Sequence, residues 1–348
     1  MGAGTVGSVL LERLSDPRSL PVQVCLVANS RWRCFDASGL DPRDALAQIQ
    51  RARAGAGGGE TGVAAGVHRH PGSGELPACF GPGDIVVDAT ASESLAAWHP
   101  RWLHRGLHVV TANKLGIGGP LLRHQRIRRQ VEQGGHYGDA ATVGAGLPLL
   151  RCVRELRAGG DRVQALAGVL SGTLAWLFDG YDGSAPFSER VREAVARGYA
   201  EPDPRVDLSG EDVRRKLLIL ARASGHALDG ADVQVESLLT PALERAADAA
   251  AADAALASMD ASLSRRAREA AAHGKVLRFV ARFEVGTARI GLEALPPVHP
   301  LAQGGACDNR VAIWSCRYAE RPLVIQGPGA GAAVTAAALL DDIRRACA

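Results

Sequence analysis

The chain opens with MGAGTVGSVLLERL (residues 1–14), and this stretch decides the fold class. Gly2, Gly4 and Gly7 form the pattern G-x-G-x-x-G, and a helical pattern follows directly. Glycines at this spacing let the main chain approach the pyrophosphate of a dinucleotide at the amino end of a helix. Such a turn normally follows a buried strand, but only Met1 precedes it. We therefore expect a dinucleotide-binding domain whose first strand is missing from the sequence.

Strand and helix patterns alternate along the N-terminal part of the chain. Val-rich apolar runs at residues 21–30, 84–90 and 107–113 predict buried parallel strands, and helical patterns separate them. The fold class predicted from this alternation is α/β, a Rossmann-type doubly wound parallel sheet. We assign it to an NAD(P)-binding domain of residues 1–140.

From about Tyr137 the pattern changes. The Ala-rich residues 241–274 predict a long helix. Three runs rich in β-branched and aromatic residues predict antiparallel strands, at residues 275–285, 288–295 and 309–318. We expect a central α+β domain over residues 141–318. Residues 319–348 predict a strand, a glycine turn and a helix that return to the nucleotide-binding domain.

Composition excludes several classes of protein. The 348 residues are 47% hydrophobic and 22% charged, with a net charge of +3 and no block of Lys and Arg, so we expect no nucleic-acid partner. No run approaches the ~20 apolar residues of a membrane helix, and no export signal is visible. The seven cysteines never occur as C-x-x-C, which predicts reduced thiols and a cytoplasmic protein without a zinc site.

The end of the second predicted strand bears on the choice of cofactor. An NAD-specific site usually has an acidic residue there to hold the ribose hydroxyls. Here Asn29 and Ser30 follow the strand, and Arg31 and Arg33 come next. A hydroxyl beside a guanidinium suits a 2′-phosphate, so the sequence favours NADP over NAD. The alternative is that both arginines are ordinary surface charges.

Two further stretches carry chemistry. The sequence TANK ends with Lys114 at the carboxyl end of a predicted parallel strand, where open α/β sheets bind their ligands. In GYAEPDPRVDLSGEDVRRKLL (residues 198–218), prolines hold an acidic segment extended before a helix. Ser209 is predicted to cap that helix, with Asp212 and Lys216 on one face. A surface salt bridge would explain that pair alone, but an amino-acid substrate with an ammonium and a carbonyl group also explains the acidic segment.

Together these stretches resemble the homoserine dehydrogenase family. The resemblance runs in the family's order through GAGTVG, ATASES, HVVTANK, VGAGLPLL, GVLSGTLAWL, GYAEPDPRVDLSGEDVRRKLLILAR and GPGAGAAVTAA, and so spans nearly the whole chain. The segment that joins Glu-Pro-Asp-Pro to Asp-x-x-x-Lys is the most specific of these motifs. The resemblance implies reversible, NAD(P)H-dependent reduction of L-aspartate 4-semialdehyde to L-homoserine, in threonine and methionine biosynthesis.

The resemblance also implies roles for individual residues. Glu201 would bind the amino group of the substrate, with Asp207 nearby. Asp212 and Lys216 would hold the substrate and manage the proton at its oxygen. Lys114 would lie between nicotinamide and substrate; which lysine gives the proton stays open, and we favour Lys216. The cofactor-binding residues would be Gly2, Ala3, Gly4, Thr5, Val6, Gly7, Thr90, Lys114 and Gly331.

Relatives often hold a monovalent cation such as Na⁺ beside the V-G-x-G segment, and this site departs from the pattern. Ala140 stands where the family often has a carboxylate, although Asp139 is adjacent. The remaining candidate ligands would be the main-chain carbonyls of Val143, Ala145 and Leu147. We expect weak cation binding there.

The resemblance leaves two interpretations of the chain. The first is an active enzyme, a homodimer formed through its central domain, with no C-terminal regulatory domain of the ACT type. The second is a truncated, inactive homologue, or a fragment of a bifunctional aspartate kinase–homoserine dehydrogenase. The missing first strand favours the second interpretation, and the retained Lys114, Glu201, Asp212 and Lys216 favour the first.

Overall fold

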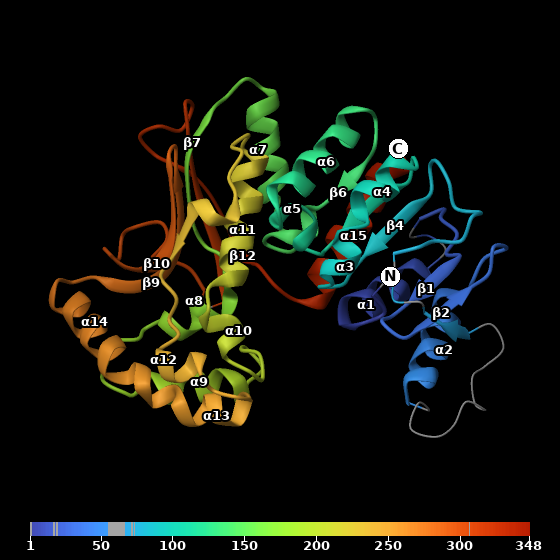
Figure 1. The fold of residues 1–348 in the computed structure, drawn as a ribbon. Coiled ribbons are helices and arrows are strands. Elements are labelled where there is room, and N and C mark those ends of the chain that lie inside the picture. The colour runs from blue at the N-terminus through green and yellow to red at the C-terminus, as the bar shows by residue number, and fades with distance from the viewer. Residues whose placement is uncertain are drawn as a thin grey trace. The chain divides into compact units, whose positions relative to one another are not determined.

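The structure is a computed structural model that describes residues 2–16, 18, 20–54, 67–70, 72, 74–305 and 307–348. The chain divides into two compact units. Unit 1 contains Met1–Gly146 and Ala330–Ala348, and unit 2 contains Leu147–Gly329. Figure 1 shows both units as a ribbon and labels the helices and many of the strands. Among the described residues, no helix is both long and apolar enough to cross a membrane.

The described residues of unit 1 form two three-stranded sheets. The first has the order β1-β2-β3 and is antiparallel, with β1 at Leu26–Ala28, β2 at Trp32–Phe35 and β3 at Val67–Arg69. The second has the order β4-β5-β6 and is parallel, with β4 at Ile85–Asp88, β5 at His108–Thr111 and β6 at Tyr137–Gly138. The helices are α1 (Thr5–Leu14), α2 (Pro42–Ala54), α3 (Glu93–Ala96), α4 (His99–His104), α5 (Leu115–Gly118), α6 (Leu121–Glu132) and α15 (Ala332–Ala346), with the 3₁₀ turn η3 (Ala140–Thr142).

The parallel sheet confirms the α/β prediction, but β1 differs from what we expected. Residues 21–30 predicted a strand with parallel neighbours, whereas β1 forms an antiparallel hairpin with β2. The Asn29 side chain explains the reversal, because its Oδ1 accepts hydrogen bonds from the N–H groups of Arg31 and Trp32, both at 2.8 Å. An asparagine that satisfies the main chain in this way stabilises a tight turn.

The C-terminal helix α15 packs within unit 1. Leu339 and Ile343 of α15 share a buried cluster with Leu10 of α1 and Val110 of β5. Burial of these side chains against a central strand provides a favourable hydrophobic free energy. The same contacts hold the amino end of α1, and with it the glycine turn, beside the parallel sheet.

Unit 2 is built on one six-stranded sheet with the order β12-β11-β7-β9-β10-β8. Its neighbours are antiparallel except for β8, which is parallel to β10. The strands are β7 (Val163–Val169), β8 (Val233–Val235), β9 (Val276–Glu284), β10 (Thr287–Leu295), β11 (Asp308–Ser315) and β12 (Leu323–Pro328). The helices are α7 (Leu149–Ala158), α8 (Gly172–Phe178), α9 (Phe187–Ala196), α10 (Arg205–Leu208), α11 (Glu211–Ala223), α12 (Pro241–Glu244), α13 (Ala249–Ala255) and α14 (Asp260–Ala272), with 3₁₀ turns η4 (Gly230–Asp232) and η5 (Leu256–Met259).

The prediction of one long helix over residues 241–274 is wrong. The segment forms α12, α13, η5 and α14 instead. Thr240 and Asp248 restart the helix, since their side chains accept hydrogen bonds from the N–H groups of Leu243 and Ala251. Capping of this kind favours a helix start at the capped residue, and here it outweighs the uniform propensity of the alanines.

Helix α11 carries the predicted pair Asp212 and Lys216 and packs against α7 and β9. The prediction that Ser209 caps this helix is wrong. Gly210 is the N-cap, with a φ of +78° that favours glycine, and no side chain caps the helix. Ser209 instead accepts a hydrogen bond from the N–H of Glu211 and donates one to the carbonyl of Val206.

Candidate active site

Two of the three glycines of the opening turn occupy positions where a side chain does not fit, and the third leaves the turn open. Gly2 has a φ of +92°, and a Cβ there would lie 2.9 Å from the Ala89 carbonyl carbon. A Cβ on Gly7 would lie 1.9 Å from the Gly2 carbonyl oxygen, so the helix fits against the turn only with glycine. Gly4 has no heavy atom within 4 Å of its Cβ position, so the turn is open there.

The amino end of α1 can hold an anion. Its N-cap is Gly4, which has no capping side chain, and its first turn contains no acidic residue. The first N–H groups of a helix lack partners within the helix and carry a partial positive charge. The main-chain N–H groups of Thr5 and Val6 in this first turn are therefore suited to a phosphate, whereas the N–H of Ala3 donates to the Ala28 carbonyl at 3.2 Å.

A buried network supports Thr90 and the TANK segment. The Asp88 carboxylate accepts hydrogen bonds from Thr90 Oγ1 at 2.6 Å and from Asn113 Nδ2 at 2.9 Å. It also pairs with His99 Nε2 at 2.9 Å, and His99 Nδ1 lies 2.8 Å from the Tyr137 hydroxyl. Asp88 therefore joins the loop after β4 to the loop after β5. Asp88, His99 and Asn113 were not predicted as functional residues; the signal for Asp88 is an acidic residue at the end of a Val-rich strand.

The charge on Asp88 is stabilised by this network. Burial opposes ionisation of the side chain, but the hydrogen bond and charge of His99 act the other way. Hydrogen bonds from Thr90 and Asn113 add to that effect. Together these partners keep the pKa of Asp88 below its usual value of 3.8. A fixed carboxylate can then orient both loops.

Lys114 and Gly331 belong to the same unit as the glycine turn. Lys114 directly follows Asn113 and is the N-cap of α5, with a partly exposed side chain. Gly331 precedes α15 with a φ of +123°, and no heavy atom lies within 4 Å of its Cβ position. Unit 1 therefore contains the whole predicted set of cofactor-binding residues.

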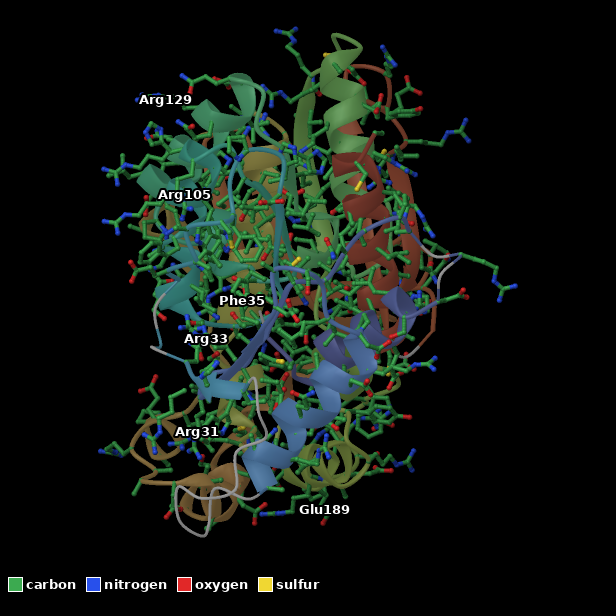
Figure 2. The ribbon with its side chains drawn as sticks, turned by 90° about the vertical axis from the view of Figure 1, so that its right-hand side faces the viewer. Arg31, Arg33, Phe35, Arg105, Arg129 and Glu189 are labelled. Carbon is green, nitrogen blue, oxygen red and sulfur yellow. The ribbon has the colours of Figure 1, made fainter. Side chains whose placement is uncertain are left out.

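The segment after β1 is basic. Figure 2 labels Arg31 and Arg33 on this hairpin. Arg33 lies opposite His68 of β3, and the main-chain N–H of His70 donates to the Arg31 carbonyl at 2.8 Å. Burial, followed by the nearby Arg33 charge, lowers the pKa of His70. Arg31, Arg33 and His70 therefore lie together near the carboxyl end of β1.

Lys216 is the centre of the polar cluster in unit 2. Its Nζ lies 2.8 Å from Asp212 Oδ2 and donates a hydrogen bond to the Leu170 carbonyl at 2.7 Å. The Lys216 side chain is 11% exposed, whereas that of Asp212 is 40% exposed. Two acceptors hold the ammonium in one position, which an ordinary surface salt bridge would not require. The Leu170 carbonyl lies 46 residues away in the chain and was not predicted.

Asp207 links the acidic segment to this cluster. Its Oδ2 accepts a hydrogen bond from the main-chain N–H of Glu201 at 2.9 Å. Burial raises the pKa of Asp207, and the nearby Asp212 charge adds to this, against hydrogen bonds from Glu201 and Thr173. The Glu201 residue is itself exposed. Asp207 therefore fixes the main chain from which the Glu201 carboxylate projects.

Asp203 has a different partner. Its carboxylate pairs with Arg205, with Nη2 to Oδ2 at 2.6 Å and Nε to Oδ1 at 2.9 Å. Arg205 also donates a hydrogen bond to the Ala246 carbonyl. Asp203 is thus neutralised by a bidentate partner and fastens the acidic segment to the loop after α12.

The polar cluster of unit 2 has an excess of negative charge. Glu201, Asp207 and Asp212 provide three carboxyl groups, and Lys216 provides one ammonium. Such a set can bind the ammonium group of a small molecule while a lysine contacts an oxygen of the same molecule. The arrangement suits proton transfer at a carbonyl or alcohol oxygen.

Of the candidate cation ligands, Val143 and Ala145 belong to unit 1 and Leu147 belongs to unit 2. Gly144 and Ala145 have φ values of +72° and +49°, so the main chain turns sharply there. The Leu147 carbonyl already accepts a hydrogen bond from Leu149 N–H at 2.8 Å. Ala140 offers no side-chain oxygen. Within the described part of the chain, no group of three or more His, Cys, Asp or Glu side chains could hold a metal ion.

Comparison with known proteins identifies the family. Residues 148–343 match the family model described as homoserine dehydrogenase, and residues 2–138 match the model of its NAD-binding domain. The chain belongs to the homoserine dehydrogenase family. Homoserine dehydrogenase from Schizosaccharomyces pombe is 39% identical over 268 residues, which cover 74% of this chain and 71% of that protein. The family prediction from the sequence is confirmed.

The chain is also similar to a longer bifunctional protein and to a protein of known structure. A bifunctional aspartokinase/homoserine dehydrogenase 1 from Zea mays is 42% identical over 269 residues, 76% of this chain and 29% of that protein. The chain thus spans less than a third of the length of this relative. A crystal structure of a protein of unknown function from Candida auris is 31% identical, with a TM-score of 0.85 over 100% of this chain and 96% of the other.

Proposed function

We propose that the chain catalyses the reversible, NADPH-dependent reduction of L-aspartate 4-semialdehyde to L-homoserine. The observation that carries this proposal is the position of Lys216, buried between Asp212 and the Leu170 carbonyl beside an acidic segment. Membership in the homoserine dehydrogenase family supports the same reaction. The proposed division of the chain is an NAD(P)-binding domain in residues 1–140, a catalytic domain in residues 141–318 and a closing segment in residues 319–348.

In this proposal the substrate is bound by charge. Glu201 accepts the substrate ammonium group, and Asp207 keeps the Glu201 main chain in place through its hydrogen bond. Asp212 holds Lys216 in position through Oδ2, and its carboxylate, on a side chain that is 40% exposed, also binds the substrate. A substrate of the same size without an ammonium group would leave the excess negative charge without a partner, which costs binding free energy.

Lys216 manages the proton at the reacting oxygen. The reduced nicotinamide, when bound, supplies the hydride for the aldehyde carbon. The oxygen becomes negative as the carbon accepts the hydride, and the Lys216 ammonium stabilises and protonates it. Homoserine oxidation reverses both transfers. Lys114 is the second candidate for the proton donor and resides with the cofactor-binding residues in unit 1.

For the cofactor, we propose a preference for NADP over NAD. The open turn at Gly4 and the uncapped end of α1 fit the pyrophosphate of either cofactor. The 2′-phosphate is distinctive of NADP, and Arg31 and Arg33 beside the end of β1 suit that group. No acidic residue occupies residues 28–33, where an NAD-specific site would have one.

The proposal also covers the binding of a monovalent cation, the oligomeric state and the cellular compartment. The carbonyls of Val143, Ala145 and Leu147 bind a monovalent cation such as Na⁺ only weakly, because Ala140 supplies no carboxylate. The protein is a cytoplasmic homodimer with a small-molecule substrate. Light scattering tests the dimer, and a comparison of turnover in NaCl and in choline chloride tests the cation.

A coupled assay tests the function. NADPH and NADH oxidation are followed at 340 nm with L-aspartate 4-semialdehyde, and the product is identified by chromatography. We expect NADPH oxidation with stoichiometric homoserine. NADPH binding without turnover supports the alternative that the chain is an inactive homologue. Turnover with simple aldehydes that lack an amino group contradicts the proposed substrate.

A further inference from the structure

Lys114 directly follows a residue that buried hydrogen bonds fix in place. Asn113 is 1% exposed, and its Nδ2 donates to Asp88 Oδ2 and to the Ser92 carbonyl, both at 2.9 Å. Its Oδ1 accepts a hydrogen bond from the main-chain N–H of Leu115 at 3.1 Å. The Asn113 side chain therefore holds the main chain on both sides of Lys114.

The short helix α5, which begins after Lys114, rests on another part of the same buried network. Gly116 of α5 is buried, and a Cβ on it would lie 2.2 Å from Tyr137 Oη and 2.7 Å from His99 Nδ1. These two side-chain atoms lie 2.8 Å apart and form a hydrogen bond. The main chain of Gly116 therefore packs directly on this hydrogen bond, and a side chain at residue 116 would displace either α5 or the pair.

The hydrogen bond between His99 and Tyr137 persists in both charge states of the imidazole. The Asp88 carboxylate only accepts hydrogen bonds, so His99 Nε2 donates to it, at 2.9 Å. In the neutral imidazole, Nδ1 accepts a hydrogen bond from the Tyr137 hydroxyl. In the imidazolium, Nδ1 donates to the Tyr137 oxygen instead. The His99 ring also stacks on Trp102, with ring centroids 5.5 Å apart, and this contact restricts its rotation.

We propose that the hydrogen bond between His99 and Tyr137 positions Lys114 for the reaction, by holding α5 at Gly116. His99 and Tyr137 are thus positioning residues that act through the main chain. This inference rests on the proposed function, in which Lys114 lies between nicotinamide and substrate.

The position of the network in the sheet supports this role. Strand β5 ends at Thr111, three residues before Lys114, and pairs with both β4 and β6. Asp88 ends β4 and Tyr137 begins β6, so the network contacts the segment after β5 from both neighbouring strands.

A fully bonded polar network restricts direction as well as distance. Buried networks whose donors and acceptors are all satisfied make a site rigid, whereas an apolar contact allows neighbouring elements to slide. Displacement of a reacting group by about 1 Å can lower a rate by about 10²-fold. A network that fixes α5 therefore affects turnover more than cofactor binding.

Two variants break the hydrogen bond from opposite sides. Tyr137→Phe removes one hydroxyl and keeps the ring. His99→Gln keeps an N–H donor for Asp88 and removes the acceptor for Tyr137. We expect each variant to lower kcat about tenfold, with the Kd for NADPH within about twofold. His104→Gln is the matched control, because His104 is an exposed histidine of the same helix α4, and its kcat should be unchanged.

The same change in a Lys114→Ala background separates positioning from a general loss of packing. If Tyr137 acts through Lys114, Tyr137→Phe should lower kcat by less than about twofold in that background. A tenfold loss that persists without Lys114 would overturn the inference. So would an unchanged kcat in Tyr137→Phe, or an equal loss in His104→Gln.

Amide hydrogen exchange provides a readout that needs no turnover, and it decides the matter where Lys114→Ala is inactive. In Tyr137→Phe we expect about tenfold faster exchange in peptides that cover residues 113–118, and unchanged exchange in α1. Unchanged exchange at residues 113–118 would overturn the inference. An original chain that binds NADPH without turnover would instead contradict the proposed function, and the exchange result would still test whether Tyr137 holds α5.

Discussion

His99 Nε2 lies 2.9 Å from Asp88 Oδ2, and both side chains have an exposed fraction of 0%. Asp88 also accepts hydrogen bonds from the two loops that carry Thr90 and Asn113. One buried carboxylate therefore connects the loop after β4 with the segment that leads to Lys114. The pair contributes to stability because removal of either partner leaves buried polar atoms without hydrogen bonds.

The first prediction concerns this pair and pH. The pKa of Asp88 is lower in the folded than in the unfolded protein. The ionised carboxylate therefore adds to the free energy of unfolding above about pH 4, and this stabilisation is lost as the pH falls through the folded pKa. Asp88→Asn should lower the free energy of unfolding at pH 7 by about 3 kcal/mol. The difference from the original protein should shrink toward pH 3. Urea unfolding at several pH values measures this; a constant difference across the range would contradict it.

The second prediction concerns Lys216. Lys216→Ala should lower kcat by about 10² to 10⁴-fold, because a positioned acid is lost. Binding of NADPH, measured by fluorescence titration, should stay within about twofold, since the cofactor residues lie in unit 1. Lys114→Ala, assayed in parallel, shows which lysine gives the proton. Unchanged turnover in Lys216→Ala would remove this residue from the reaction.

The third prediction separates binding from chemistry. Glu201→Gln should raise the KM for aspartate 4-semialdehyde about tenfold or more, because an amide cannot neutralise the substrate ammonium. kcat should change little. Glu189→Gln is the matched control: Glu189 is an exposed carboxylate on α9 of the same unit, labelled in Figure 2. An effect of equal size in both variants would show that general surface charge is responsible.

The fourth prediction uses the raised pKa of Asp207. The folded state holds this proton more tightly than the unfolded chain, mainly because of burial. Its ionisation therefore reduces stability as the pH rises through the raised pKa. Asp207→Asn cannot ionise, so its stability relative to the original protein should be greater at pH 7 than at pH 3. Thermal unfolding at both pH values measures the two differences, and the reverse order would argue against a raised pKa.

The fifth prediction concerns cofactor choice. Arg31→Ala and Arg33→Ala should each raise the KM for NADPH about tenfold and leave the KM for NADH unchanged, because only NADPH carries the 2′-phosphate. Arg129→Ala is the control, since Arg129 is an exposed arginine of α6 in the same unit (Figure 2). Equal effects on NADPH and NADH would show that the arginines do not recognise the 2′-phosphate.

Local spacing explains what the sequence could predict. The requirement for glycine at Gly7 follows from its contact with Gly2 in the same turn, and the pair Asp212–Lys216 follows from the helical period. Contacts between distant segments were not predictable in this way. The Leu170 carbonyl reaches Lys216 across 46 residues, and His99 meets Asp88 only after α4 packs behind β5.

Hydrogen bonds between polar side chains and main-chain N–H groups explain the two wrong predictions of secondary structure. Asn29 satisfies two N–H groups and so turns the chain into the β1–β2 hairpin, which the apolar run before it did not indicate. Thr240 and Asp248 act similarly in the Ala-rich segment. In each case a single polar side chain outweighed the average preference of its neighbours.

In the proposed reaction the carbon of one substrate carbon–oxygen bond accepts the hydride, and Lys216 protonates the oxygen of the same bond. The most direct measurement follows deuterium from NADPH that carries deuterium at both hydrogens of nicotinamide carbon 4 into the product, by mass spectrometry. We predict homoserine with one deuterium on the alcohol carbon, formed at least about 10²-fold more slowly by Lys216→Ala. Homoserine without deuterium, or equal rates in the two proteins, would contradict the account.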